Sequence, residues 1–120
     1  MVKEPNLSDS LPVSELPLGL PASYWKDLRE YDQAATLAGL SLPVLLLQGE
    51  RDYQVTMVDF DLFQKALPKR KNVTFRSYGN LNHLFMDGEG KATPSEYLEP
   101  GVVDNAVITD IANWIRERSD

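Results

Sequence analysis

The sequence lacks cysteine, and histidine occurs only once among its 120 residues. Without cysteine the chain can form no disulfide, no thiolate metal site and no cysteine nucleophile. Its apolar runs are far shorter than the roughly 20 residues of a membrane helix, and its first residues lack the apolar stretch of a signal peptide. We therefore expect a cytoplasmic protein without membrane contact, and we expect no metal and no other cofactor.

Basic residues are outnumbered and scattered along the chain. The sequence holds 12 Lys and Arg against 18 Asp and Glu, which gives a formal net charge of −6. Binding to nucleic acid needs a concentrated Lys and Arg surface, because the ligand is a row of phosphates. The composition therefore predicts no nucleic-acid partner.

The first 21 residues are rich in proline. They hold four of the eight prolines and show no sustained periodicity, which predicts an irregular arm. Several leucines in this segment are too apolar for a free linker. We expect the arm to pack on another surface.

A helical pattern follows the arm. Tyr24, Leu28, Tyr31 and Ala35 recur at steps of four, three and four, and predict one helix that begins after Ser23 and ends at Gly39. Aromatic residues in such a stripe are those of a packed core or of a pocket for a small molecule.

Residues 44–78 have the pattern strand, helix, strand. The unbroken apolar run 44–47 predicts a buried strand, and the alternation over residues 72–78 predicts a second one. Between them Thr56 and Asp59 form a capping-box pattern, before a helix that Pro68 ends. A strand, helix, strand sequence makes a right-handed crossover between parallel strands. The fold class is therefore α/β, with parallel strands and flanking helices.

The last helix is predicted from a single apolar stripe. Its members recur at helical spacing and are Val103, Val107, Ile111, Trp114 and Ile115.

One acid and the single histidine follow the same ends of the two predicted strands. Asp52 closes a Gly-x-x-Asp turn after the first strand, and His83 comes shortly after the second. Neighbouring strands lie about 4.8 Å apart, so the two loops can bring a carboxylate to an imidazole nitrogen. Each residue taken alone is more often structural than catalytic. Their shared position at the strand ends places an acid and an imidazole together.

These residues resemble the C-terminal part of an α/β-hydrolase. Residues 45–55 (Leu-Leu-Leu-Gln-Gly-Glu-Arg-Asp-Tyr-Gln-Val) are similar to that family's turn with the acid of the catalytic triad, and residues 78–85 (Tyr-Gly-Asn-Leu-Asn-His-Leu-Phe) to its histidine loop. The resemblance covers roughly residues 22–118 and is nearest to dienelactone hydrolase-like and prolyl oligopeptidase-like serine hydrolases. It implies that residues 22–120 are the C-terminal part of an α/β-hydrolase domain.

The family's nucleophile has no counterpart in this sequence. That serine lies in a Gly-x-Ser-x-Gly elbow between a strand and a helix, and the nearest string here, at residues 39–43, ends in Pro and precedes a strand. We therefore expect Ser41 to be a connecting residue. We also expect the chain to be the C-terminal fragment of a longer enzyme and to be inactive by itself.

The resemblance implies hydrolysis of an ester or a peptide. A serine elsewhere attacks the acyl carbonyl, His83 moves the proton, and Asp52 fixes the tautomer of the ring. Tyr53, Leu84 and Phe85 are the candidate walls of the substrate pocket.

Two other functions stay open at the level of sequence. The chain could be a non-catalytic interaction module that retains the acid and the histidine, or a domain that binds a small molecule without chemistry. In every case two strands alone leave an open sheet edge. We therefore expect a partner, either the missing N-terminal part of the hydrolase or a second copy of the chain.

Overall fold

A computed structural model describes residues 6–67 and 72–118. These residues divide into two compact units, one up to Leu37 and one from Ala38 onward. Both predicted strands, Asp52 and His83 belong to the second unit.

The first unit holds the proline-rich arm and the helix α1 (Ala22–Glu30). Two short 3-10 turns, η1 (Val13–Glu15) and η2 (Pro17–Gly19), break up the arm. Leu7 and Leu16 are buried against Ala22, and Trp25 packs on the same cluster. The expectation that the arm packs on another surface is confirmed, and that surface belongs to α1.

The prediction of one continuous helix from Ser23 to Gly39 was wrong. The chain leaves the helical conformation at Tyr31, where φ is −77° and ψ is 120°, and a second helix, α2, spans Gln33–Ala38. Asp32 caps this second helix, because its Oδ1 accepts a hydrogen bond of 2.8 Å from the backbone N–H of Ala35.

The apolar stripe predicted for this segment is also wrong. Its members Tyr24, Leu28, Tyr31 and Ala35 are all exposed. Ala22 and Trp25, which are three residues apart, form the face that packs on the arm instead.

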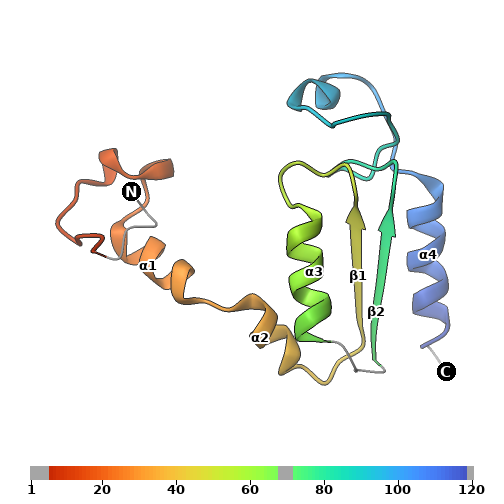
Figure 1. The fold of residues 1–120 in the computed structure, drawn as a ribbon, viewed down its shortest axis with the longest axis horizontal. Coiled ribbons are helices and arrows are strands. Elements are labelled where there is room, and N and C mark those ends of the chain that lie inside the picture. The colour runs from red at the N-terminus through yellow and green to blue at the C-terminus, as the bar shows by residue number, and fades with distance from the viewer. Residues whose placement is uncertain (1–5, 68–71, 119–120) are drawn as a thin grey trace. The chain divides into compact units, whose positions relative to one another are not determined.

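Two parallel strands form the centre of the second unit (Figure 1). Strand β1 spans Val44–Gly49 and β2 spans Val73–Tyr78. The register pairs Val44 with Val73 and Gly49 with Tyr78. Both strands and their parallel direction agree with the sequence prediction, and β1 continues two residues beyond the apolar run.

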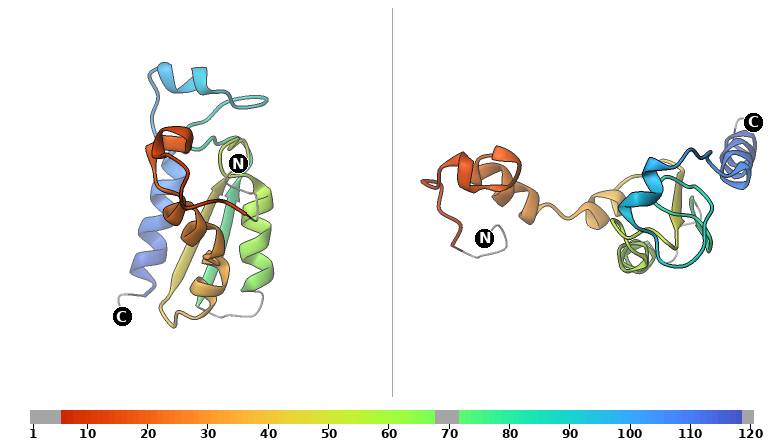
Figure 2. Two further views of the ribbon diagram at one scale, coloured as in Figure 1. Left: turned by 90° about the vertical axis from the view of Figure 1, so that its left-hand side faces the viewer. Right: turned by 90° about the horizontal axis from the view of Figure 1, so that it is seen from above.

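Helices cover opposite faces of this sheet (Figure 2). On one face lies α3 (Met57–Ala66), whose Phe60 meets Phe75 of β2 edge to face, with 5.6 Å between the ring centroids. On the other face lies α4 (Asn105–Arg116), where Trp114 Nε1 donates to Thr74 Oγ1 at 3.2 Å. The alternation of β2 produces this division, because Thr74 and Phe75 point to opposite sides.

The predicted start of α3 is confirmed. Thr56 and Asp59 form the capping box, with a hydrogen bond of 2.9 Å from the Thr56 N–H to Asp59 Oδ2. Pro68, the expected end of this helix, lies outside the described residues.

The stripe predicted for α4 is only partly buried. Val107 is buried, whereas Ile111 and Ile115 are exposed. The helix instead turns Asp110 toward the sheet, where it accepts a hydrogen bond of 2.7 Å from the Tyr78 hydroxyl. Burial and this bond raise the pKa of Tyr78 to about 12.

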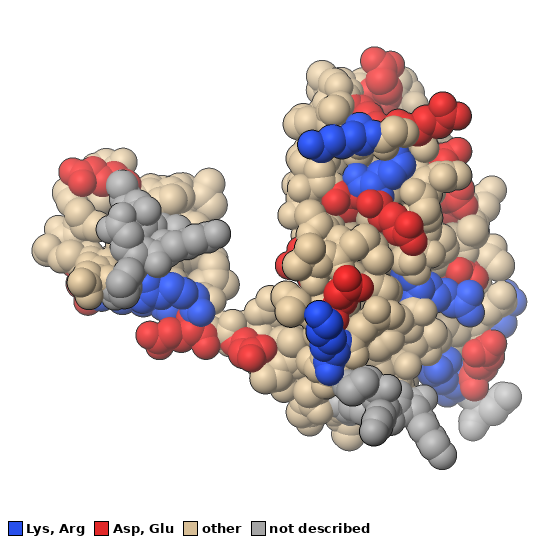
Figure 3. Space-filling view, viewed as in Figure 1, with Lys and Arg blue, Asp and Glu red and all other residues tan. Residues whose placement is uncertain are grey.

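A long connection between β2 and α4 lies beyond the carboxyl ends of the strands (Figure 1). It contains a 3-10 turn, η3 (Pro94–Leu98), and an isolated bridge between Leu81 and Asp87. Over the face drawn in Figure 3, acidic and basic side chains of this unit are interspersed. In the described parts of the chain, no helix combines the length and apolar character that crossing a membrane requires.

Gly49, the last residue of β1, allows this connection to approach the strand. A Cβ atom there would lie 2.5 Å from the backbone carbonyl oxygens of Leu81 and Asn82. We expect Gly49→Ala to lower the free energy of unfolding by about 1–3 kcal/mol, because backbone must move to relieve the overlap. Urea unfolding followed by circular dichroism measures the change.

Gly79→Ala is the matched control. A Cβ atom at Gly79 would meet Glu50 Oε2 at 3.9 Å, which is an ordinary contact. Equal stability of the two variants would contradict the close approach at Gly49.

Candidate active site

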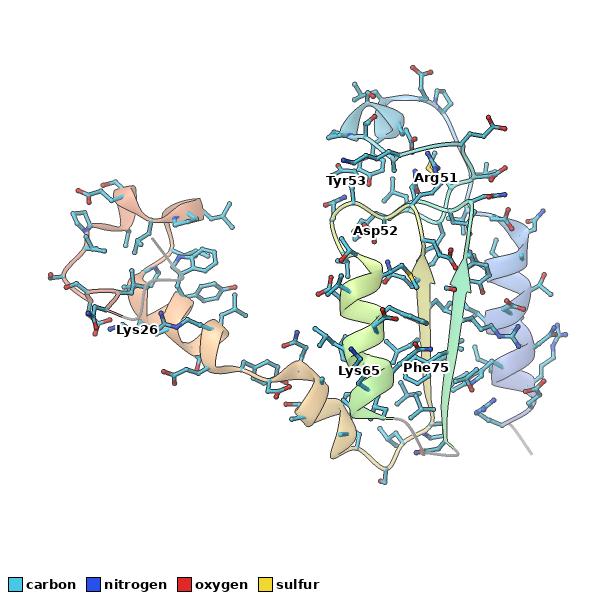
Figure 4. All side chains as sticks on the ribbon, viewed as in Figure 1. Lys26, Arg51, Asp52, Tyr53, Lys65 and Phe75 are labelled. Carbon is cyan, nitrogen blue, oxygen red and sulfur yellow. The ribbon has the colours of Figure 1, made fainter. Side chains whose placement is uncertain are left out.

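The turn that carries Asp52 (residues 49–55, the acid turn) is hydrogen-bonded to the loop that follows β2. The backbone N–H of Glu50 donates to the Tyr78 carbonyl at 2.9 Å, and that of Arg51 donates to the Leu81 carbonyl at 3.0 Å. Figure 4 shows Arg51, Asp52 and Tyr53 at the end of the sheet toward which both strands point. The carboxyl ends of parallel strands are where open α/β sheets bind ligands.

Asp52 and His83 form a hydrogen-bonded pair at this end. His83 Nδ1 lies 2.8 Å from Asp52 Oδ2, so the structure brings together the two residues that the sequence singled out. The Asp52 side chain is 6% exposed and that of His83 is 38% exposed. An ionised carboxylate only accepts hydrogen bonds, so the proton between them is carried by Nδ1. Nε2 is then left as an acceptor, as a general base requires.

Hydrogen bonds from the acid turn and from His83 hold the Asp52 carboxylate, and Gln48 adds a longer one. Oδ1 accepts from the backbone N–H of Gln54 at 2.8 Å and of Val55 at 3.0 Å, while Oδ2 faces His83. Burial raises the pKa of Asp52, but the hydrogen bonds from Val55, His83 and Gln54 outweigh it and bring the pKa below its ordinary value. The group is therefore ionised at neutral pH.

Gln48 supports the same carboxylate from β1. Its buried side-chain amide donates to the Val55 carbonyl at 2.7 Å and to the Gly49 carbonyl at 3.0 Å, with Asp52 Oδ2 at 3.4 Å. One polar side chain near the end of the strand thereby anchors both ends of the acid turn.

Asn82 shapes the histidine loop. Its residue surface is 1% exposed, and its Oδ1 accepts from the backbone N–H of Leu84 at 2.9 Å and of Met86 at 3.1 Å. The turn it closes holds Phe85 at a φ of 56°, a conformation that bulky residues adopt only when their surroundings enforce it.

Arg51 links the acid turn to the segment between β2 and α4. Its side chain is 8% exposed, and it donates to the carbonyl oxygens of Asn80 at 3.2 Å, Glu89 at 3.1 Å and Gly90 at 2.7 Å. It also forms an ion pair with Glu96.

In the described part of the chain, Asp52 lines a smaller and a larger cavity. The smaller one, of about 190 Å³, is lined by His83 and Phe85 together with Gln48 and Val55. The larger one, of about 770 Å³, is lined by Tyr53, Met57, Lys91 and Thr93 among others, and His83 is not in its lining. Chemistry at His83 therefore belongs to the smaller cavity, although the larger one has more room for a ligand.

The three predicted pocket residues lie in different places. Phe85 lines the smaller cavity. Tyr53 lines the larger one and stacks on Tyr97 at a centroid distance of 6.0 Å. Leu84 is exposed and belongs to neither lining within the described chain.

Sequence reasoning missed Arg51, Asn82 and Glu96. Arg51 and Asn82 had no predicted role beyond their membership of the two motifs, and Glu96 lies in an irregular segment whose sequence predicts no position. Among the described residues, no group of three His, Asp or Glu side chains is close enough to hold a metal ion.

The lowered pKa of Asp52 predicts how stability depends on pH. An acid that binds its proton less readily in the folded chain stabilises the fold above its unfolded-state pKa of about 4. That contribution is lost as the pH falls through the lower, folded-state pKa. Between about pH 5 and pH 2, the free energy of unfolding should therefore fall more steeply for the wild-type chain than for Asp52→Asn, as urea unfolding at each pH would measure.

Asp61→Asn, which removes an exposed carboxylate from α3, is the control and should follow the wild-type profile. Parallel profiles for the wild type and Asp52→Asn would contradict the favourable hydrogen bonding of this acid.

A curated protein is similar to this chain. It is named Esterase EstD, from Thermotoga maritima, and is 48% identical over 105 residues, which cover 88% of this chain and 26% of that protein. No protein-family model matches the chain, and no solved structure matches it. The chain thus spans 26% of the length of the curated relative that it matches.

Proposed function

We propose that this chain is the part of a serine ester hydrolase of α/β-hydrolase fold that supplies the acid, Asp52, and the general base, His83. The observation that carries the proposal is the 2.8 Å contact between Asp52 Oδ2 and His83 Nδ1, made at the carboxyl ends of two adjacent parallel strands. The similarity to a protein named as an esterase supports it. The substrates are small carboxylic esters or peptides.

In the proposed reaction a serine hydroxyl attacks the acyl carbonyl carbon and gives its proton to His83 Nε2. Asp52 accepts the Nδ1–H bond throughout and stabilises the imidazolium. His83 then gives the proton to the leaving alkoxide or amine, which departs and leaves an acyl-enzyme. Water, deprotonated by the same Nε2, releases the acid and regenerates the serine.

The nucleophile comes from residues outside this chain. Ser41 precedes β1, and its carbonyl accepts a hydrogen bond of 2.9 Å from the side chain of Asn72, which immediately precedes β2. It therefore lies at the amino end of the sheet, a strand length of roughly 17–20 Å from the end that carries Asp52. A Gly-x-Ser-x-Gly string in the remainder of the hydrolase is the proposed source.

A partner polypeptide completes the sheet in this proposal. In the described chain the sheet has two strands, so β1 and β2 each have one open edge, and Ile108, Ile111 and Ile115 of α4 are exposed. Open edges and exposed apolar side chains favour association. The polypeptide that pairs with these strand edges is the rest of the hydrolase or, for the isolated chain, a second copy of the chain.

We expect the purified 120-residue chain to self-associate in sedimentation velocity experiments. The associated fraction should rise with protein concentration. A compact monomer at every concentration would contradict this part of the proposal.

Activity is best tested in a chimera. In it, the 105 matching residues of the Thermotoga maritima protein are replaced by those of this chain. We expect the chimera to hydrolyse p-nitrophenyl acetate and the isolated chain to show no turnover. In the chimera, His83→Ala and Asp52→Asn should each lower kcat by about 10⁴-fold, because the proton acceptor or its tautomer is lost.

Asp61→Asn in the same chimera is the matched control for the loss of one carboxylate and should leave kcat unchanged. A folded chimera in which His83→Ala hydrolyses the ester at the full rate would overturn the proposal. A folded chimera that binds an ester analogue without hydrolysis would favour a binding module. A parallel assay with a peptide p-nitroanilide distinguishes esters from peptides as substrates.

A further inference from the structure

We infer that Glu96 is a positioning residue, which holds His83 against Asp52 by bridging the residues that precede each of them. This inference rests on the proposed function, because it assigns Glu96 a part in the same site. Glu96 comes from η3 (Pro94–Leu98), far along the chain from both members of the pair.

The bridge uses both oxygens of one carboxylate. Oε1 pairs with Arg51 Nη2, and Oε2 accepts a hydrogen bond of 3.1 Å from Asn82 Nδ2. Arg51 is the residue before Asp52, and Asn82 is the residue before His83. A single carboxylate therefore joins the side chains of the two residues that precede the acid and the base.

The Arg51 end of the bridge is fixed by charge. The guanidinium is buried, and among the described residues its other hydrogen bonds go to neutral carbonyl oxygens, those of Asn80, Glu89 and Gly90. A buried cation needs a compensating anion, and losing its partner is costly. Glu96 supplies that anion, so its carboxylate has little freedom to move.

The Asn82 end is fixed by hydrogen bonding. The side-chain oxygen of Asn82 holds the backbone N–H groups of Leu84 and Met86, while its NH₂ group donates to Glu96. The amide plane therefore cannot turn over without losing acceptors for two backbone donors. Moving Glu96 would shift this plane, and with it the turn that contains His83.

The bridge acts on the reaction only through geometry. No contact joins the Glu96 side chain to the imidazole among the described interactions of His83, whose Nδ1 faces Asp52. A catalytic hydrogen bond loses its effect when its partners shift by about 1 Å. Holding the two preceding residues at a fixed separation keeps the 2.8 Å contact and the Nδ1–H tautomer.

Glu96→Gln tests the bridge without changing its size. Both oxygens of Glu96 face donors, so the NH₂ group of glutamine must oppose either Arg51 or Asn82. Because the chain has a single histidine, the ¹⁵N resonances of one imidazole report directly on its tautomer at a pH where the ring is uncharged. We expect the wild-type ring to carry its proton mainly on Nδ1, and the ring in Glu96→Gln to populate both tautomers.

Asp52→Asn provides the reference for the opposite tautomer. The oxygen of the introduced amide stays with the N–H groups of Gln54 and Val55, so its NH₂ group faces Nδ1 and drives the ring proton to Nε2. Glu99→Gln is the matched control, since it removes an exposed carboxylate three residues from Glu96 and should leave the spectrum unchanged.

A rescue variant keeps the test decisive if Glu96→Gln unfolds. Asn82→Asp alone places the carboxylates of residues 82 and 96 against each other, so we expect the His83 ring to populate both tautomers. The double variant N82D/E96Q has the wild-type net charge and reverses the donor and acceptor of the hydrogen bond between positions 82 and 96. The amide oxygen of the introduced glutamine then accepts from Arg51, and the carboxylate that offsets the Arg51 charge lies on the far side of that amide, at position 82. The second oxygen of the introduced carboxylate can still accept from the two backbone N–H groups. We expect the double variant to restore the Nδ1–H tautomer.

In the active chimera, Glu96→Gln should lower kcat by about 10- to 100-fold and leave KM within about twofold, and N82D/E96Q should recover most of that loss. A folded Glu96→Gln chain with the wild-type tautomer would overturn the inference, as would a folded double variant without rescue. The spectra of the isolated chain need no turnover. An inactive chimera with the expected spectra would therefore count against the proposed function and leave the positioning role of Glu96 standing.

Discussion

The candidate site depends on the buried guanidinium of Arg51, whose charge and hydrogen-bond donors must be satisfied inside the protein. A positive charge in a side chain that is 8% exposed needs hydrogen-bond acceptors for its donors and an anion for its charge. The connection between β2 and α4 supplies both, through three carbonyl oxygens and Glu96. A segment without long regular elements thereby acquires a defined path over the strand ends.

Asp52 and His83 meet because of the direction of the two strands and because of the path of the connection between β2 and α4. Parallel strands deliver both residues to one end of the unit, and the close approach at Gly49 lets the two loops touch. The buried Asn82 then closes the turn around His83. Sheet direction decides which residues meet, and the polar contacts of Arg51, Asn82 and Glu96 decide how closely.

The electrostatics of the pair favour one protonation pattern. Two backbone N–H groups and the imidazole offset the cost of burying the Asp52 carboxylate and lower its pKa. The same backbone donors fix which oxygen faces His83. The acid is thus charged and correctly oriented before any substrate arrives, so that little reorganisation is needed during the proposed reaction.

Much of the second unit could be predicted from the sequence, because its signals are local. The apolar run 44–47, the alternation over 72–78 and the capping box of Thr56 and Asp59 each report on neighbouring residues, and together they determined the parallel pair and the meeting of Asp52 with His83. The break at Tyr31 escaped prediction because Asp32 competes as a cap within a continuous stripe. Which face of α4 is buried, and that Glu96 joins Arg51 to Asn82, only the tertiary structure decided. These contacts link residues 14 to 45 positions apart, and no periodicity or spacing in a sequence encodes a hydrogen bond across such a distance.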